Sequence, residues 1–303
     1  MKTALVTGSN GFVGRHMVDY LVDLDYEVRC VDIAYDGLSA VEYFHFADEV
    51  YDLAVHCAYK VGGRATIDGT NLNLADNLIL DAELFNWAVR TQQRAILYFS
   101  SSAVYPTHFQ GQYCHKNLEE RDLSLDVANP DANYGWAKVT GERLAKAANE
   151  LGLRVHVVRP FSGYGADQSL DYPFPSIIRR ARNNDLTVWG PPGQTRDWIH
   201  IDDVVRAAYA VYRDDDRRPV NLCTGVGTEM GALAKTAWDL AFDRGFLGLP
   251  HHNTAPVARP QVTYDICKPT GVRYRVGNPT RMLEHYTPEI SVEDGIKLAL
   301  RKD

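Results

Sequence analysis

An apolar run near the start of the chain ends in a glycine-rich loop that a helical pattern follows, and this feature constrains the fold most. Residues 4–16 read ALVTGSNGFVGRH, with glycines at 8, 11 and 14. Gly8 permits a tight turn, Gly11 lets the backbone approach a phosphate without a Cβ, and Gly14 lets a helix pack closely on the strand. A strand, loop and helix of this kind place backbone N–H groups against a pyrophosphate. The loop alone leaves an ordinary strand-to-helix turn as the alternative.

A second apolar run ends in an acidic residue, about 20 residues after the glycine loop. Residues 27–33 read EVRCVDI, so Asp32 stands at the end of a predicted strand. An acidic side chain there accepts both hydroxyls of an adenosine ribose and repels a 2′-phosphate. Asp32 therefore favours NAD over NADP, and the alternative is that it only caps the following turn.

Strand-like apolar runs alternate with helical patterns through the first half of the chain. This alternation is typical of a parallel sheet with helices on both faces. We therefore predict an α/β fold in which residues 1–160 form a Rossmann-type, doubly wound parallel sheet that binds NAD. Between residues 33 and 53, any third strand must be short. The runs and helical patterns are 53–58, 71–90, 95–99, 134–148 and 155–159.

Proline and glycine interrupt the pattern repeatedly after residue 160, which predicts a smaller, irregular α/β lobe over residues 161–303. We expect this C-terminal lobe to bind the substrate, and segments near 195–225 to return to the first sheet. Residues 107–133 form a polar segment whose length indicates a functional loop. Further helices are predicted over 175–183, 203–213 and 230–242, and a further strand over 220–223.

The composition argues against several classes of partner. The chain has 303 residues, a net charge of −7 and no basic block, so we expect no nucleic acid. No apolar stretch approaches the roughly 20 residues of a membrane span, and the chain enters its first strand directly, which predicts neither a membrane anchor nor a signal peptide. Five scattered cysteines indicate reduced thiols and a cytoplasmic location. His108, Cys114 and His115 match no standard ligand spacing, so we expect no metal.

Three side chains form a candidate catalytic set. Tyr134 and Lys138 share a helix face at i and i+4, and Ser101 follows a buried strand. A lysine ammonium and an oxidised nicotinamide would lower the tyrosine pKa by about 3 units from its usual value near 10, which is about 4 kcal/mol. With Ser101 holding a substrate hydroxyl, the set would take a proton from an alcohol while hydride leaves for the nicotinamide. Alone, the tyrosine–lysine spacing also fits a surface pair.

These residues occur within a longer series of motifs that resembles the extended short-chain dehydrogenase/reductases, in the branch that acts on nucleotide sugars. The family's catalytic hydroxyl lies four residues before a strand-end tyrosine, here Tyr105, and this selects Ser101. Its Thr-Arg-Asp segment supplies an arginine to the nucleotide diphosphate, here Arg196, for which a surface salt bridge is the alternative. The matching motifs are TGSNGFVG (7–14), Asp32, HCA (56–58), FSSSAVY (99–105), YGWAK (134–138), Arg159-Pro160 and TRDWIHIDD (195–203).

The resemblance also implies binding residues and an assembly. It implies substrate contacts from Lys60, Ser102, Ser162 and Arg196 to a nucleotide-diphosphate sugar. It implies a homodimer built from the helices around 71–90 and 134–150. The implied NAD contacts are Gly8, Asn10, Gly11, Phe12, Val13, Gly14, Asp32, Ile33, Cys57, Ala58, Tyr59, Tyr134, Lys138 and Pro160.

Departures from the family pattern narrow the reaction. Dehydratases carry Asp-Glu after the catalytic hydroxyl residue, whereas Ser102-Ala103 follows here. Residues 60–63 (KVGG) and 268–271 (KPTG) resemble GDP-fucose synthases and GDP-mannose 3,5-epimerases, but Ala103 replaces their cysteine and Tyr172 falls near their second acid/base. We therefore predict an NAD-dependent epimerase that works through a 4-keto sugar. A nucleotide-4-ketosugar reductase and a non-catalytic NAD-binding regulator are the alternatives.

Overall fold

The computed structural model describes residues 1–34, 37–62, 72–111, 115–242 and 258–302, and its largest sheet has six parallel strands. The strand order is β10-β6-β4-β3-β1-β2, so the chain starts near one edge and winds outward in both directions. The α/β, Rossmann-type prediction is confirmed. The strands are β1 (Lys2–Thr7), β2 (Tyr26–Val31), β3 (Leu53–His56), β4 (Ile96–Phe99), β6 (Val155–Pro160) and β10 (Val220–Leu222).

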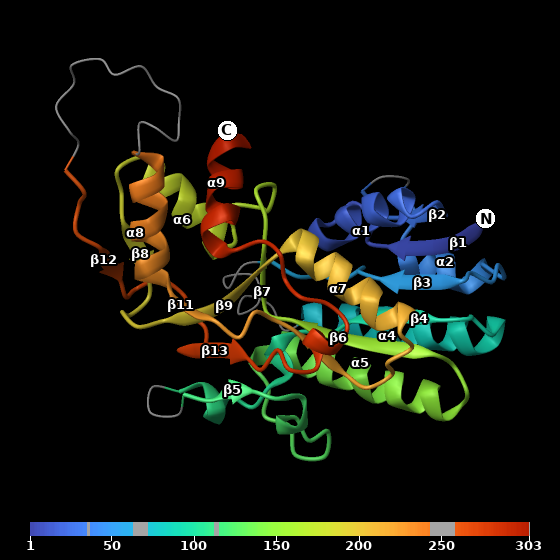
Figure 1. The fold of residues 1–303 in the computed structure, drawn as a ribbon. Helices are drawn as coiled ribbons and strands as arrows, with labels where there is room; N and C mark the ends of the chain where they lie inside the picture. The colour runs from blue at the N-terminus through green and yellow to red at the C-terminus, as the bar shows by residue number, and fades with distance from the viewer. Residues whose placement is uncertain (35–36, 63–71, 112–114, 243–257, 303) are drawn as a thin grey trace.

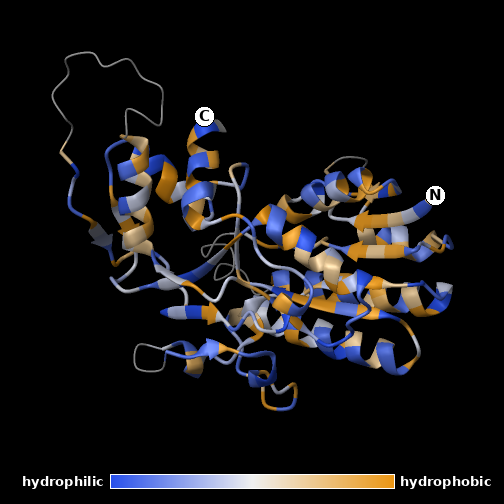
Figure 2. Cartoon of the chain, viewed as in Figure 1, coloured by the Kyte–Doolittle hydropathy of each residue, from blue (hydrophilic) through white to orange (hydrophobic). Residues whose placement is uncertain are grey.

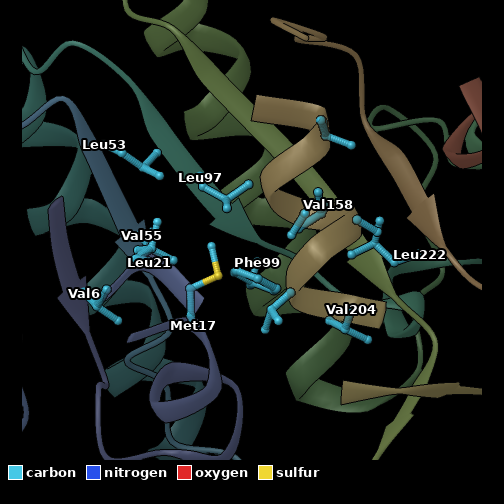
Figure 3. Close-up of a cluster of buried hydrophobic side chains, with 14 of the residues drawn as sticks. Val6, Met17, Leu21, Leu53, Val55, Leu97, Phe99, Val158, Val204 and Leu222 are labelled. Atoms are coloured by element: carbon cyan, nitrogen blue, oxygen red, sulfur yellow. The ribbon is translucent and has the colours of Figure 1, made fainter. Parts of the chain in front are cut away.

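Helices cover both faces of this sheet because successive strand residues point to opposite sides. Val6 packs in a core with α1 (Phe12–Asp23) and α7 (Ile201–Arg213), as Figure 3 shows. Leu5 packs in a second core on the other face. The helices of that face are α2 (Ala40–Phe46), α4 (Leu72–Thr91) and α5 (Ala132–Glu150).

The second lobe contains two small sheets and three helices that share a separate core (Figure 1). One sheet has the order β11-β9-β13-β5, with β7 beside β9, and the other pairs β12 with β8. The strands are β5 (Asn117–Leu118), β7 (Ser162–Tyr164), β8 (Thr187–Trp189), β9 (Thr195–His200), β11 (Gly227–Glu229), β12 (Thr263–Asp265) and β13 (Tyr274–Gly277). The helices are α6 (Pro173–Arg182), α8 (Met230–Ala241) and α9 (Val292–Lys302).

Local chemistry explains several helix starts. Ser39 and Glu42 form a reciprocal capping box at α2, which pairs two backbone N–H groups that the helix leaves unpaired. Asp202 and Asp203 lie in the first turn of α7, where negative charge stabilises the helix dipole. Pro173 lies in the first turn of α6, where its missing N–H has no cost.

The structure corrects several predicted boundaries. Among the described residues between Val31 and Leu53, the chain forms α2 and no third strand. The segment 107–133 is less irregular than predicted, since it holds β5 and the short helices η2 (Thr107–Gln110) and η3 (Glu120–Asp122). Helices α5, α6 and α7 each begin two residues earlier than predicted, and Asn71 lies outside the described residues. The domain limits at 160 and 161 stay a prediction, although α7 and β10 do pack in the first sheet's layers.

Hydrophobic residues follow the sheet and the inner faces of its helices, and hydrophilic residues follow the outer faces (Figure 2). The helical spacing of Met17, Leu21 and Leu24 predicts one face of α1. Met17 and Leu21 are fully buried, whereas Leu24 is exposed at the C-cap. The same spacing places Leu74 and Leu78 on one face of α4, where both are only half-buried. Over the described part of the chain, every helix is too short or too polar to cross a membrane.

Candidate active site

The glycine loop packs so tightly that side chains would not fit. Gly8 has φ +68°, and a Cβ there would lie 2.5 Å from Ala58 N. A Cβ on Gly14 would lie 2.0 Å from Gly8 O, and Gly11 N donates to Gly8 O at 3.0 Å. The loop leads directly into α1, whose first N–H groups have no intrahelical partner. This cradle fits the diphosphate of a dinucleotide, as predicted from the sequence.

Asp32 joins the end of β2 to the glycine loop. Its Oδ2 accepts a hydrogen bond from Asn10 N at 2.9 Å, and its Oδ1 accepts one from Ala34 N at 2.9 Å. Asp32 therefore does cap the following turn, yet each carboxylate oxygen keeps a further lone pair for a ribose hydroxyl. Ile33 beside it is 69% exposed, which leaves an apolar surface next to this carboxylate.

Two predicted cofactor contacts can act only through their backbones. The Phe12 ring packs against Gly165 of the second lobe and stacks on Arg15, whose Cζ lies 5.4 Å from the ring centroid. Val13 packs against the core of α1 and α7. Because both side chains are engaged, what Phe12 and Val13 offer to a diphosphate is their N–H groups at the start of α1.

The residues after β3 and β6 complete the cofactor side. Cys57 N donates to Thr7 O at 3.0 Å, and Ala58 lies against Gly8. Burial raises the pKa of the Cys57 thiol to about 12, so the group stays neutral. Pro160 ends β6 at the same edge of the sheet. The carboxyl ends of these parallel strands are directed toward the second lobe (Figure 1), where open α/β sheets bind ligands.

The structure brings Ser101 and Tyr134 together. The Ser101 hydroxyl lies close enough to Tyr134 to lower its pKa, and Ser101 Oγ accepts a hydrogen bond from Ala103 N at 3.1 Å. Gly135 allows this approach, because a Cβ there would lie 2.5 Å from Ala103 O. Burial raises the pKa of Tyr134 well above its usual value, and the Ser101 hydroxyl opposes that rise. The predicted fall in this pKa includes the charge of bound nicotinamide and stays a prediction.

Lys138 lies one helical turn after Tyr134, and its ammonium contacts Phe99 and Tyr59. Its Nζ donates to Phe99 O at 2.7 Å and lies 3.2 Å from the centroid of the Tyr59 ring. The residue is 3% exposed, and burial lowers the pKa of Lys138 to about 8. Lys138 is thus still mostly charged at neutral pH but titrates close to it, which the i, i+4 spacing did not indicate.

The predicted substrate contacts are distributed over several elements, and their roles stay predictions. Lys60 is exposed and pairs with Asp76 at 2.7 Å, between Nζ and Oδ2. Ser102 is buried in the short helix η1 (Ser102–Val104), and Ser162 begins β7. Arg196 lies half-buried in β9, where its Nη1 donates to Thr195 O at 2.8 Å.

Sequence reasoning missed Arg275, whose charge acts on Tyr134, and its ion-pair partner Asp131. Arg275 of β13 pairs with Asp131, the N-cap residue of α5, at 2.9 Å and donates to Gln110 Oε1 at 2.6 Å. The charge of Arg275 favours the phenolate of Tyr134, and Tyr172 opposes it. Only the N-cap position of Asp131 was readable in the sequence, because Arg275 comes from a strand 144 residues away.

A cationic site with an aromatic centre lies in the second lobe. Trp189 of β8 is 47% exposed, and two cations lie over its ring. Arg180 Cζ is 5.5 Å and Lys268 Nζ is 5.3 Å from the ring centroid. The KPTG motif thus contributes its lysine to a cation–π contact with Trp189.

The sequence predicts no metal, and its candidate cluster lies partly outside the described residues. Cys114 lies outside the described residues, so the cluster with His108 and His115 is not tested. Within the described residues, Asp216, Glu284 and His285 lie close enough to share an ion. Arg218 already bonds both carboxylates, so a cation is present there without a metal.

Comparison with known proteins agrees with this geometry. Residues 4–223 match the NAD dependent epimerase/dehydratase family, which is more than half of the chain. The chain belongs to this family. NAD is therefore its cofactor, and the glycine cradle and Asp32 are the parts of the chain that fit it.

Relatives within this family have several activities. GDP-L-fucose synthase of Escherichia coli (strain K12) is 25% identical, over 97% of this chain and 94% of its own length. A dTDP-4-dehydro-6-deoxy-D-allose reductase of Streptomyces bikiniensis is 27% identical, over 93% of this chain and 90% of its own. UDP-glucose 4-epimerase of Thermotoga maritima, solved with UDP-glucose, superposes with a TM-score of 0.77 and 21% identity over 99% of this chain and 97% of its own. The last likeness shows the shared fold.

Proposed function

We propose that this protein is an NAD-dependent epimerase of a nucleotide-diphosphate sugar that works by transient oxidation at C4. The observation that carries the proposal is the close packing of the start of α5, which carries Tyr134, against the segment that follows Ser101: Asp131 N donates to Ala103 O at 2.9 Å, and a Cβ on Gly135 would lie 2.5 Å from the same oxygen. A regulator that only binds NAD has no use for a serine and a tyrosine placed in this way, nor for a lysine on the same helix. The chain's family supports the cofactor and the general chemistry.

The residues of this chain would handle the proton. NAD, when bound, supplies the acceptor for a hydride and can return it. Ser101 holds the C4 hydroxyl of the sugar, and Tyr134 takes its proton at Oη, with the charge of Lys138 favouring the phenolate. For epimerisation, the 4-keto sugar would rotate in the site so that its opposite face receives the hydride. Tyr134 would then return the proton to the C4 oxygen. Ala103 and Ser102 offer no acid or base for dehydration or for epimerisation at C3 and C5.

The second lobe would hold the nucleotide. Trp189 offers a stacking face, and Arg180, Lys268 and Arg196 offer positive charge for a diphosphate. We propose a GDP sugar, a choice supported by the KPTG motif and by the substrate in the name of GDP-L-fucose synthase.

A 4-ketosugar reductase is the second candidate. Two observations favour it: relatives named as synthases or reductases of such sugars align over nearly the whole chain, and burial raises the pKa of Tyr134. A protonated Tyr134 is the form that donates to a keto group. The reductase would consume one reduced cofactor for each sugar, whereas the epimerase would consume none.

The test is to incubate the purified protein with GDP-, UDP-, CDP- and dTDP-hexoses, with and without NAD, and with the matching 4-keto sugars and NADH or NADPH. We expect exchange between C4 isomers without net change in the absorbance of reduced nicotinamide. With deuterium at C4 of the sugar, the product isomer should keep the label. Stoichiometric loss of reduced cofactor with a keto sugar, and no isomer exchange, would establish the reductase instead.

A further inference from the structure

A buried carboxylate lies between the helix that carries Tyr134 and its neighbour α4. Asp81 of α4 is 0% exposed, and its Oδ2 accepts hydrogen bonds from Tyr98 OH at 2.7 Å and Tyr59 OH at 3.0 Å. Gly141 of α5 faces this group, where a Cβ would lie 2.5 Å from Asp81 Oδ2 and 1.9 Å from Tyr98 OH. The close approach of the two helices therefore depends on a glycine, and the carboxylate belongs to their interface.

The negative charge of Asp81 is only partly balanced by these hydrogen bonds. A buried carboxylate needs hydrogen bonds and a countercharge. Among the described residues, Asp81 Oδ1 has no hydrogen-bond partner, and His56 Nε2 lies 3.7 Å away. His56 supplies no charge, because burial lowers its pKa to about 3, and Thr7 Oγ1 lies 2.8 Å from its Nδ1. Burial raises the pKa of Asp81, and the charge of Lys138 is the largest influence that opposes this rise.

Tyr59 connects this carboxylate with both members of the Tyr134–Lys138 pair. Its hydroxyl donates to Asp81, and its ring face receives the Lys138 ammonium at 3.2 Å. The ring of Tyr59 also meets the ring of Tyr134 edge-on, with 5.8 Å between centroids and an interplanar angle of 85°. One tyrosine side chain thus contacts the proposed proton carrier and the proposed cation, and a hydrogen bond to Asp81 fixes its position.

We propose that Tyr59 and Asp81 are positioning residues for Lys138. Tyr59 seats the ammonium on its ring face, and Asp81 orients that ring and supplies the negative charge that keeps the buried lysine protonated beside Tyr134. The inference rests on the proposed function, in which a charged Lys138 favours the phenolate of Tyr134.

Without such a countercharge, burial would leave Lys138 neutral and of no use to Tyr134. Burial is the largest influence on the pKa of Lys138 and lowers it, and the charge of Asp81 is the largest that raises it. Smaller contributions come from Cys57 and Glu142. The titratable groups that face Lys138 from the surrounding elements are His56, Cys57 and Tyr59 on and after β3, Asp81 on α4, Tyr98 on β4, and Glu142 on α5.

Two substitutions separate the effect of the Asp81 charge from the effect of the Tyr59 ring, and a third substitution is the matched control. Asp81→Asn removes the charge and keeps the shape and an acceptor for a tyrosine. Tyr59→Leu removes the ring face and the hydroxyl without adding a polar group. Glu83→Gln removes the same charge two residues further along α4, where the carboxylate faces His45 at 3.3 Å.

The first measurement is the titration of Lys138 by NMR, with lysine labelled at Cε and the signal assigned by its loss in Lys138→Met. We expect Asp81→Asn to lower the midpoint by about one pH unit, because a neighbouring charge shifts a buried group by this order. Tyr59→Leu should lower it by about one unit as well, because a desolvated cation–π contact has that strength. Glu83→Gln should leave it unchanged.

The second measurement is the pH profile of kcat/KM. Because activity needs a protonated Lys138, a lower lysine pKa should move the alkaline limb of the profile to lower pH by the same amount. In Asp81→Asn, whose side chain is not among the implied NAD contacts, NAD affinity below that limb should stay within about twofold. If the titration midpoint of Lys138 is unchanged in both Asp81→Asn and Tyr59→Leu, the inference is overturned. If one variant does not fold, the other variant still tests the inference. A wild-type protein that converts no sugar would overturn the proposed function instead, since the NMR midpoints need no substrate.

Discussion

Arg159 and Glu142 form a bidentate ion pair inside the protein: Arg159 Nη2 donates to Glu142 Oε2 at 2.6 Å, and Nε donates to Oε1 at 2.8 Å. Both side chains are at most 3% exposed. Ser100 Oγ donates to the same carboxylate at 2.6 Å, and Arg159 Nη1 donates to Tyr105 OH at 2.9 Å. The pair thus joins α5 to β6 directly beneath the serine segment that carries Ser101.

Breaking this pair should destabilise the whole fold. Glu142→Gln leaves a buried guanidinium without a countercharge, and we expect a loss of about 3–5 kcal/mol in the free energy of unfolding. Urea titration followed by circular dichroism measures it. Asp126→Asn, which removes an exposed partner of Arg143, is the control and should cost about 0.5 kcal/mol or less. A loss below about 1 kcal/mol for Glu142→Gln would show that the interior tolerates the lone charge.

Removing the phenol of Tyr134 should abolish turnover and leave the cofactor bound. Tyr134→Phe takes away only Oη, so we expect kcat to fall by about 10³ or more while NAD affinity changes little. Ser101→Ala should reduce kcat by about 10² because the substrate hydroxyl loses its hydrogen-bond partner. Steady-state kinetics and calorimetric titration with NAD measure the two effects. Full activity in Tyr134→Phe would exclude the proposed chemistry.

Asp32 should control the choice between NAD and NADP. Asp32→Asn keeps acceptors for Asn10 N or Ala34 N but removes the charge that repels a 2′-phosphate. We expect the affinity ratio of NADP to NAD to rise by about tenfold, since one like charge at a surface site is of this order. Competitive binding of the two cofactors measures the ratio. An unchanged ratio would mean that Asp32 acts only on the turn.

His16 should stabilise the protein below neutral pH. Its Nε2 lies 3.1 Å from Asp167 Oδ2 and its Nδ1 3.5 Å from Asp202 Oδ1, which ties α1 to the segment after β7. The hydrogen bond to Asp202 raises the pKa of His16 above 6.5. A raised histidine pKa adds stability that is fully present below the unfolded pKa and is lost as pH rises through the folded pKa.

The expected result is a pH-dependent gap between wild type and His16→Gln. The wild type should have the higher unfolding midpoint at about pH 6, and the gap should narrow by about pH 8, when the imidazole is neutral. His45→Gln is the control, because His45 is exposed and pairs with Glu83 at the surface. A gap that stays constant with pH would assign the effect of His16 to packing alone.

The fold was readable from residues that are close in sequence. The glycines at 8, 11 and 14 and the apolar runs at β1, β3, β4 and β6 depend on local sterics and on the period of two along a strand, so they predict elements and their order. Helix boundaries differed from prediction where a residue can either precede a helix or begin it. Pro173, for example, begins α6 instead of preceding it. After Ile33 the apolar pattern left open a short strand, and the described residues there form α2 instead, whose capping box of Ser39 and Glu42 the apolar pattern does not record.

The sequence by itself determined the dinucleotide cradle, the acidic residue at the end of β2, and the spacing of Tyr134 and Lys138, because these follow from backbone geometry and from residues one turn apart. The choice of Ser101 as the third member of the candidate catalytic trio came from the family resemblance. Only the tertiary structure decided the pKa values, and so the protonation states, of Tyr134 and Lys138. Burial raises the pKa of Tyr134, Lys138 lies on the ring of Tyr59, and the charge of Asp81 is the largest influence that raises the pKa of Lys138. A protonation state depends on the dielectric and the charges within a few ångströms, and those come from α4, β4 and β13, which are distant in the chain.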